Sequence, residues 1–225
     1  MIEIKKIKDE IKNYRKNFKV SFDTKEDFYK RENPKISIII TIYNQDNFLK
    51  FIYGCIQKQS LKDIEIIFVD DNSIDKSSSI IKEFMKEDKR IIYIKNKYNQ
   101  RAFHSRNKGI LASKGEYILV IDPDDLLIND ILIKAYETAK NYNLDILQYY
   151  ITSGTYKINS IWRKLKYNNG ILYNNSQVKN VLYYGITRNL WDKLIKRDIY
   201  IKSINFMKEE FKKNYMFYIM MILLF

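Results

Sequence analysis

The sequence is poor in the residues that build disulfides and zinc sites. Its 225 residues include one cysteine, Cys55, and one histidine, His104. A single cysteine excludes an intrachain disulfide and a multi-cysteine zinc site, and a single histidine excludes a metal site made of several imidazoles. Because Cys55 falls within an apolar pattern of helical period, we interpret it as a small core residue rather than a nucleophile.

Long hydrophobic runs are also missing. Residues 1–6 lack the apolar stretch of a signal peptide, so we expect a cytoplasmic protein. The apolar run at residues 215–225 has eleven residues, fewer than the roughly 20 that a membrane-spanning helix needs. We expect this run to form a buried helix. An interfacial segment and a longer helix that the chain end cuts off are the alternatives.

Acidic residues are scarce relative to basic ones, with 27 Asp and Glu against 40 Lys and Arg, and the net charge is +13. Such a balance can attract nucleic acid, an anionic membrane surface or a phosphorylated substrate. The densest basic stretches, residues 5–19 and 157–166, match no nucleic-acid-binding motif. We therefore expect no nucleic-acid partner and interpret most lysines as solvated surface. A peripheral association with the cytoplasmic membrane face stays open.

Glycine and proline are rare, at 6 and 2 residues, and regular periodic segments fill most of the chain up to residue 150. Apolar runs typical of buried strands cover residues 36–42, 64–69, 90–94, 117–121 and 145–150, and segments of helical period cover residues 46–59, 74–86, 105–113 and 128–142. This alternation predicts an α/β domain with a mostly parallel sheet flanked by helices. Residues 1–33 read as a polar, partly helical extension. Residues 151–225 are expected to complete the same domain, with apolar residues at 180–184 and 190–195 returning to it.

Polar residues follow three of the predicted strands. Thr41, Tyr43 and Asn44 end the first strand, Asp71-Asn72-Ser73 follows the second, and Asp122-Pro123-Asp124-Asp125 follows the fourth. Ligands of open parallel sheets bind beyond the carboxyl ends of the strands. The sequence therefore predicts a binding site at this edge of the sheet.

The carboxylates of Asp122 and Asp124 are two residues apart and can converge on one hard cation. Mg²⁺ and Mn²⁺ prefer oxygen ligands, and Mg²⁺ is usually held by one or two carboxylates together with phosphate oxygens. The alternative for this segment is a capped turn in which Pro123 occupies a turn position.

The other polar residues also have two interpretations each. Asp71 can accept hydrogen bonds from a base or ribose, or it can cap the following helix together with Ser73, a candidate N-cap. Arg101 and Arg106, near the third predicted helix, can pair with a diphosphate or form surface salt bridges. Thr41 and Tyr43 offer a hydroxyl and a ring to a base, or are ordinary strand-end residues.

Together these segments resemble the nucleotide-binding half of the family-2 inverting glycosyltransferases, which have the GT-A fold. The resemblance is carried by Ile36–Asn44 (ISIIITIYN), Ser60–Ser73 (SLKDIEIIFVDDNS), Arg106–Ile110 (RNKGI) and Gly115–Leu126 (GEYILVIDPDDL). Their order and spacing match as well, across about residues 35–150. The segment Trp191–Leu194 (WDKL) is similar to a Trp-x-Lys-Leu segment that some bacterial members carry on the acceptor side.

The resemblance implies transfer of a sugar from a nucleotide-sugar donor, most often a UDP-sugar, to a glycan or lipid-linked acceptor with inversion. Residues 34–150 would be the nucleotide-sugar-binding half and residues 151–225 the acceptor side. The implied nucleotide-sugar-binding residues are Thr41, Tyr43, Asn44, Asp71, Arg101 and Asp122. Asp122 and Asp124 would hold a Mg²⁺ or Mn²⁺ ion on the diphosphate, supported by Asp125.

Two features depart from the family pattern. Many members have a glycine between the third strand and its helix, where this chain has residues 99–104 (NQRAFH). An inverting transfer also needs a carboxylate base, which the family usually places in a Glu-Asp pair that opens a late helix. The late acids here are Glu209 and Glu210, and the helix that follows them lacks further acids.

Three hypotheses therefore remain, beside a binding or scaffold module as the general non-enzyme alternative. In the first, Glu209 or Glu210 is the base of an active glycosyltransferase. In the second, the protein is truncated or impaired and only binds nucleotide sugar. In the third, it is a nucleotidyltransferase, against which the order of the motifs argues.

Overall fold

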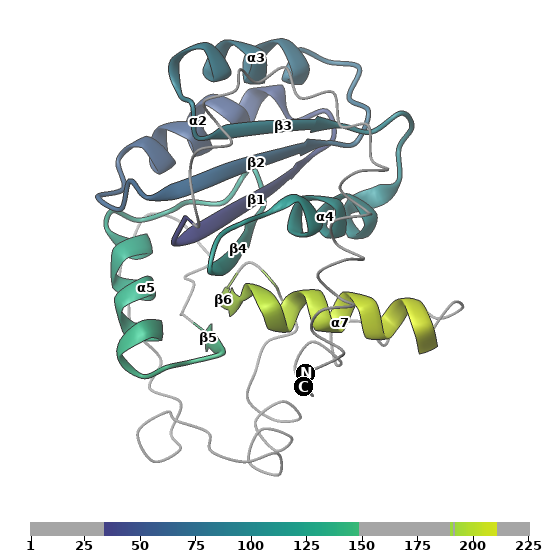
Figure 1. Ribbon diagram of the computed structural model, residues 1–225. Coiled ribbons are helices and arrows are strands. Elements are labelled where there is room, and N and C mark those ends of the chain that lie inside the picture. Colours follow the sequence, from purple (N-terminus) through teal and green to yellow (C-terminus); the bar gives the residue numbers. More distant parts are fainter. Residues whose placement is uncertain (1–33, 149–189, 191, 211–225) are drawn as a thin grey trace.

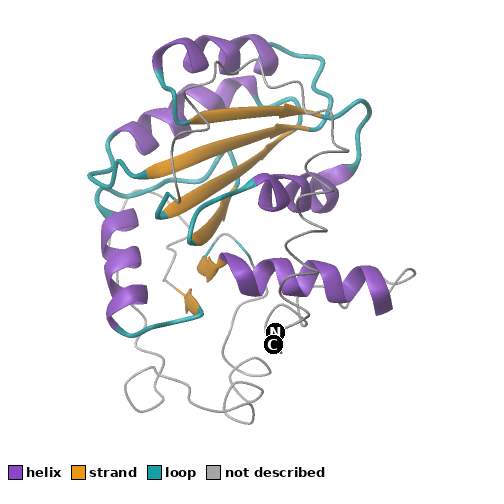
Figure 2. Ribbon diagram, viewed as in Figure 1, coloured by secondary structure: helices purple, strands orange, loops and turns teal. Residues whose placement is uncertain are grey.

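The computed structural model describes residues 34–148, 190 and 192–210. Within these residues one sheet of six strands runs through the domain (Figure 2). The strands are β1 (Ile36–Ile42), β2 (Ile64–Asp70), β3 (Ile91–Lys95), β4 (Tyr117–Ile121), β5 (Ile146–Gln148) and β6 (Lys193–Lys196). Their order across the sheet is β3-β2-β1-β4-β6-β5. The first four strands in this order are parallel, and β6 pairs antiparallel with both β4 and β5.

Helices cover both faces of the sheet (Figure 1). They are α2 (Asp46–Gln57), α3 (Ser77–Glu87), α4 (Arg101–Ala112), α5 (Ile131–Asn141) and α7 (Arg197–Glu210). Apolar side chains of α2, α3 and α5 share one core cluster with one face of β1, β2 and β4. Side chains of α4 and α7 share a second cluster with the other face. The predicted α/β class and its mostly parallel, helix-flanked sheet are thus confirmed.

The strand β1 explains why an isoleucine-rich run forms the centre of the sheet. Successive side chains of a strand point to opposite faces. Ile38 and Ile40 accordingly lie in the first core cluster, whereas Ile39, between them, lies in the second. Every residue of β1 is buried. A central parallel strand with helices on both faces needs apolar, β-branched side chains on both of its sides.

The observed elements differ from the predicted ones mainly at their ends. The strands at 36–42 and 117–121 match residue for residue. Helix α3, however, begins at Ser77 rather than at residue 74. The carboxylate of Asp75 accepts hydrogen bonds from the backbone N–H groups of Ser77 and Asp46, at the starts of α3 and α2. Ser73 is therefore not an N-cap, and that prediction was wrong.

The same hydrogen bonds also lower the pKa of the Asp75 carboxyl. Burial acts to raise this pKa, but hydrogen bonds from Ser77 and Asp46 outweigh it and hold the pKa below its usual value.

Helix α4 begins four residues earlier than predicted, at Arg101, and α5 begins at Ile131.

Residues 190–195 return to the sheet, as the apolar pattern predicts. Leu190, Leu194 and Ile195 are buried, and the last two belong to β6. The predicted N-terminal extension, the apolar residues at 180–184 and the helix at 215–225 lie outside the described residues. No helix within the described ranges is long and apolar enough to cross a membrane.

Candidate functional site

The carboxyl ends of β2, β1 and β4 lie side by side. These strands are neighbours in the parallel part of the sheet, and their register pairs Ile42 with Asp70 and Ile40 with Ile121. The loops that begin after these strands therefore leave the same edge of the sheet. This is the edge at which open α/β sheets bind ligands, and it carries the three polar segments singled out in the sequence.

The loop after β1 is tied to the loop after β2. Asn44 adopts a left-handed backbone with a φ of 54°. Its backbone N–H donates to Oγ of Ser73 at 3.1 Å, and its Oδ1 accepts from the backbone N–H of Ile74 at 3.0 Å. Thr41 is buried, whereas Tyr43 is 49% exposed. Asn44 thus shapes the edge, and the ring of Tyr43 is open to solvent beside it.

Asp71 is held inside this edge rather than at a helix start. Its side chain is buried, at 3% exposure, and its Oδ1 accepts from Nδ2 of Asn96 at 2.7 Å and from the backbone N–H of Gln100 at 2.8 Å. Neither partner belongs to α3. The interpretation of Asp71 as a cap of the following helix was wrong. The carboxylate is instead fixed between β2 and the β3–α4 loop.

Arg101 occupies an unusual position at the start of α4. Its φ is 67°, in the left-handed region that favours glycine, and its backbone N–H donates to Oδ1 of Asn99. Residues 96–104 contain no glycine, so Arg101 itself adopts this backbone conformation. The side chain of Arg101 is exposed at the helix start.

Arg106 and Asp122 form an ion pair between α4 and the loop after β4. Nη2 of Arg106 lies 2.8 Å from Oδ1 of Asp122, with both side chains partly exposed. Helix α4 lies close to the sheet, so Arg106 can reach Asp122. A Cβ added to Gly109 would lie 2.6 Å from Cγ2 of Ile39 and 3.0 Å from Cγ2 of Val69. The absent side chain of Gly109 therefore lets the helix pack against β1 and β2.

The segment after β4 is a closed turn in which the three carboxylates have different surroundings. Oδ2 of Asp125 accepts from the backbone N–H of Asp122, and the backbone N–H of Asp125 donates back to the carbonyl of Asp122. Burial raises the pKa of the Asp125 carboxyl, and the charges of Asp122 and Asp124 act in the same direction. Asp124 is exposed, and within the described ranges nothing pairs with it. The turn interpretation therefore holds for Asp125 and leaves Asp124 open to a ligand.

Metal-ligating side chains form no large cluster in the described part of the chain. No group of three or more His, Cys, Asp or Glu side chains there could hold a metal ion. Asp122 and Asp124 are two carboxylates, which is the number that Mg²⁺ often takes from a protein when phosphate oxygens complete its shell. The donor set fits a cation that shares its ligands with a bound diphosphate.

The predicted acceptor-side residues are only partly described. Glu209 and Glu210 end α7, and their side chains lie outside the described part, as does Trp191. Asp192 and Lys193 are both buried and form an ion pair with each other. Leu194 pairs with Leu119, which places the start of β6 beside the carboxyl-terminal part of β4.

Two buried polar residues that hold loops of the domain, Asn96 and Gln59, are absent from the sequence-based prediction. Asn96 follows β3 directly and contacts Asp71. Gln59 donates from Nε2 to the carbonyl of Ile128 and accepts from the backbone N–H of Leu132, so it holds the loop that joins β4 to α5. Asn96 had a usable signal, since it is the polar residue at the end of a fourth parallel strand. Gln59 ends a helical pattern and had none.

Known proteins resemble this chain in both sequence and structure. The Streptococcus pneumoniae protein "Glycosyltransferase GlyA" is 36% identical over 114 residues, which are 51% of this chain and 16% of that protein. The Borreliella burgdorferi "Cholesterol galactosyltransferase" is 32% identical over 182 residues, or 75% of this chain and 50% of that protein. The chain thus spans at most half the length of these two relatives.

A solved structure has the same fold. S. aureus TarS 1-349 in complex with UDP-GlcNAc superposes with a TM-score of 0.59 at 18% identity, covering 76% of this chain and 47% of that one. Residues 37–205 match the family described as "Glycosyl transferase family 2". That match spans the sheet, the three strand ends and most of α7, and the chain therefore belongs to glycosyl transferase family 2.

Proposed function

We propose that the described edge of the sheet binds a nucleoside diphosphate sugar, with UDP as the nucleotide, and that the protein transfers its sugar. The observation that carries this proposal is the convergence of Asp71, Asp122 and the Tyr43 ring on one sheet edge. The UDP-GlcNAc bound to the structural neighbour favours a uridine nucleotide. In this proposal Thr41, Tyr43 and Asp71 contact the base and ribose, and Arg101 approaches the phosphates.

The proposed metal ligands are Asp124 and Asp122, which would hold Mg²⁺ or Mn²⁺ against the diphosphate. Such an ion stabilises the negative charge that develops on the leaving nucleoside diphosphate. Asp124 is exposed and carries no competing partner in the described part of the chain, whereas Asp122 already pairs with Arg106. Asp125 supports both by closing the turn. Arg106 supplies positive charge beside the same carboxylates.

The proposed reaction is an inverting transfer. A hydroxyl oxygen of the acceptor attacks the anomeric carbon of the donor sugar, and the bond from that carbon to the diphosphate oxygen breaks. The nucleoside diphosphate leaves with the electron pair, and a carboxylate base takes the acceptor proton. Glu209 and Glu210 are the candidates for this base. The proposed acceptor is a glycan or a lipid-linked molecule, and the relative named "Cholesterol galactosyltransferase" supports only the lipid character of such an acceptor.

Calorimetric titration with UDP tests the proposed metal site. Wild type should bind UDP more tightly with Mn²⁺ than with a chelator. Asp124→Asn should remove most of this metal-dependent gain, because a neutral amide is a weaker ligand for a hard cation. Asp130→Asn removes the same charge from the same β4–α5 loop and serves as the matched control. Equal metal-dependent affinity in wild type and Asp124→Asn would exclude Asp124 as a ligand.

A transfer assay separates an active enzyme from a binding protein. Purified protein is incubated with a panel of UDP- and GDP-sugars, Mn²⁺ and candidate acceptors, and nucleoside diphosphate release is measured. Glu209→Gln and Glu210→Gln identify the base if one of them abolishes release while UDP binding persists. UDP binding without release by wild type would favour the impaired, binding-only alternative.

A further inference from the structure

Asn96 stands at the end of β3, next to the donor edge, and no family motif quoted above includes it. It is 1% exposed, and its backbone N–H donates to the carbonyl of Asp70 at 2.8 Å. This bond fixes the residue beside the carboxyl end of β2. The side chain is therefore anchored one strand away from Asp71.

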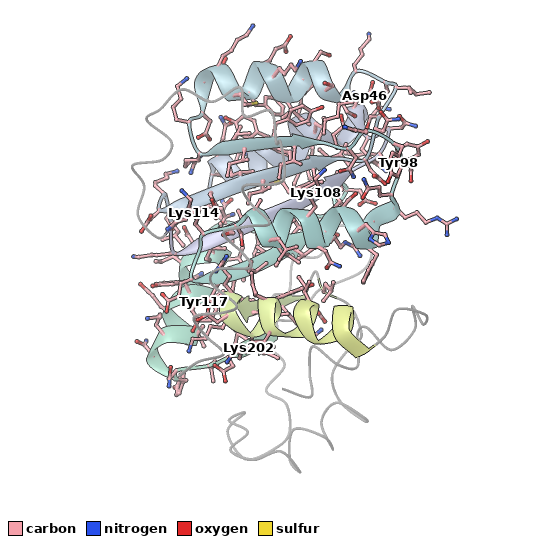
Figure 3. All side chains as sticks on the ribbon, turned by 45° about the vertical axis from the view of Figure 1, so that its right-hand side comes forward. Asp46, Tyr98, Lys108, Lys114, Tyr117 and Lys202 are labelled. Atoms are coloured by element: carbon pink, nitrogen blue, oxygen red, sulfur yellow. The ribbon has the colours of Figure 1, made fainter. Side chains whose placement is uncertain are left out.

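The side-chain amide of Asn96 has three hydrogen bonds. Its Nδ2 donates to Oδ1 of Asp71 at 2.7 Å and to Oγ of Ser105 at 2.8 Å. Its Oδ1 accepts from Nζ of Lys108 at 2.7 Å, and Lys108 reaches this point from α4 (Figure 3). An ammonium group can only donate. The oxygen of the amide must therefore face Lys108, which leaves the NH₂ group to face the carboxylate of Asp71.

This arrangement fixes the two oxygens of Asp71 in different surroundings. Oδ1 accepts from Asn96 and from the backbone of Gln100, so its acceptor positions are largely used. Oδ2 is the oxygen with acceptor capacity left for a ligand. A buried carboxylate without the Asn96 bond could rotate about its last torsion, which is soft for aspartate.

We propose that Asn96 is a positioning residue for donor binding, and that with Lys108 it orients Asp71 so that Oδ2 faces the nucleotide. The inference rests on the proposed donor site. Asn96 acts through Asp71 and does not itself touch the donor. Lys108 contributes by fixing the amide, and burial lowers its pKa while the charge of Asp71 acts to raise it.

The neighbouring carboxylate provides a matched control. Asp70 is also buried, and it accepts from the hydroxyl of Tyr93 on β3 at 2.6 Å. Asp70 also accepts from the backbone N–H of Ser73, within its own loop. The same two strand ends thus carry two comparable hydrogen bonds, one to Asp71 from Asn96 and one to Asp70 from Tyr93. Only the first concerns the proposed ligand contact.

The test compares Asn96→Asp, Asn96→Ala and Tyr93→Phe with wild type. Asn96→Asp keeps the side-chain shape and an acceptor for Lys108, but it replaces the donor to Asp71 with a second carboxylate. Losing a hydrogen bond to a charged group should weaken UDP binding by about tenfold or more in both Asn96 variants. Tyr93→Phe should change the UDP affinity less than about twofold while lowering the melting temperature. In sugar-nucleotide turnover, the KM for the donor should rise in the Asn96 variants and kcat should stay close to wild type.

The outcomes separate this proposal from the donor site itself. Wild type is titrated with UDP, GDP and ADP, and the tightest nucleotide is used for the variants. If wild type binds none of them, the proposed donor site is wrong, and the role of Asn96 is wrong with it. If wild type binds and Asn96→Asp binds equally well, only the positioning role is wrong. An equal loss of UDP affinity in Tyr93→Phe would show that any lost hydrogen bond at these strands weakens binding. That result would also overturn the positioning role of Asn96.

Discussion

Arg101 begins α4 with a φ of 67°, a backbone conformation that costs a residue with a side chain about 1–2 kcal/mol. Asn44 and Asn72 also have positive φ, but asparagine tolerates this region far better than arginine does. Strained residues of this kind persist where the surrounding structure holds them, and they concentrate at functional sites. The strained backbone at Arg101 therefore supports a functional role for its side chain, because glycine would be easier to accommodate there.

Replacing Arg101 should separate stability from binding. Arg101→Gly should raise the free energy of unfolding by up to about 1 kcal/mol, because relief of strain exceeds the entropy that glycine adds to the unfolded chain. The same change should weaken UDP binding if the guanidinium meets the phosphates. Urea denaturation and calorimetry measure the two effects.

Arg101→Ala is the matched control for this pair of effects. It removes the guanidinium but keeps a side chain at positive φ, so affinity should fall without a gain in stability. A glycine variant that is less stable than wild type would contradict the assignment of strain. An alanine variant with unchanged UDP affinity would remove Arg101 from the donor site.

At the scale of elements, the packing of α4 against the sheet decides where Arg106 lies. Gly109 allows this packing because a Cβ there would clash with Ile39 on β1. Gly54, in α2, offers a direct comparison, because a Cβ at that position meets nothing within 4 Å. The two glycines lie inside helices of equal length. A side chain would clash with the sheet at Gly109, whereas there is space for one at Gly54.

Alanine substitutions should therefore have opposite signs at these two positions. Gly109→Ala should lower the free energy of unfolding by about 1–3 kcal/mol, because the helix must move away from the sheet. Gly54→Ala should raise it by up to about 1 kcal/mol through helix propensity alone. Chemical denaturation of both variants tests this. A stabilised Gly109→Ala protein would contradict the close packing of α4.

Some elements are predictable from the sequence residue for residue, and others depend on contacts that no local pattern carries. Periodicity predicts β1 and β4 residue for residue, because buried strands carry their signal in every residue. The start of α3 depends on Asp75 and its bond to Asp46, a contact between different elements that no local pattern carries. Polar residues at the strand ends predicted that three loops meet at one edge of the sheet, whereas the pairing of Asn96 with Asp71 depends on which strands are neighbours.

At the scale of the whole molecule, β6 joins the parallel strands β1 to β4 to a later part of the chain. Leu194 pairs with Leu119 on β4 and with Leu147 on β5, and it is 1% exposed. Among the described strands, β5 is hydrogen-bonded to the sheet only through β6. The sheet is therefore continuous across most of the family match, rather than ending with the parallel strands.

A cavity at Leu194 should weaken the domain as one unit. Leu194→Ala should lower the free energy of unfolding by about 2–5 kcal/mol, with a single cooperative transition. The exposed residue Lys202 on α7 provides the control, since Lys202→Ala should stay within about 0.5 kcal/mol of wild type. Two separate transitions in thermal denaturation of wild type would contradict a single sheet-based unit.

The strand order also has a consequence for synthesis on the ribosome. The chain emerges in the order β1 to β6, so β2, β1 and β4 are all available before β6 is translated. A nascent chain can thus assemble the parallel strand ends that form the proposed site while the outer side of β4 is still unpaired. Unpaired strand edges invite aggregation, so the outer edge of β4 stays open to pairing with other chains until residues 193–196 are synthesised and cover it.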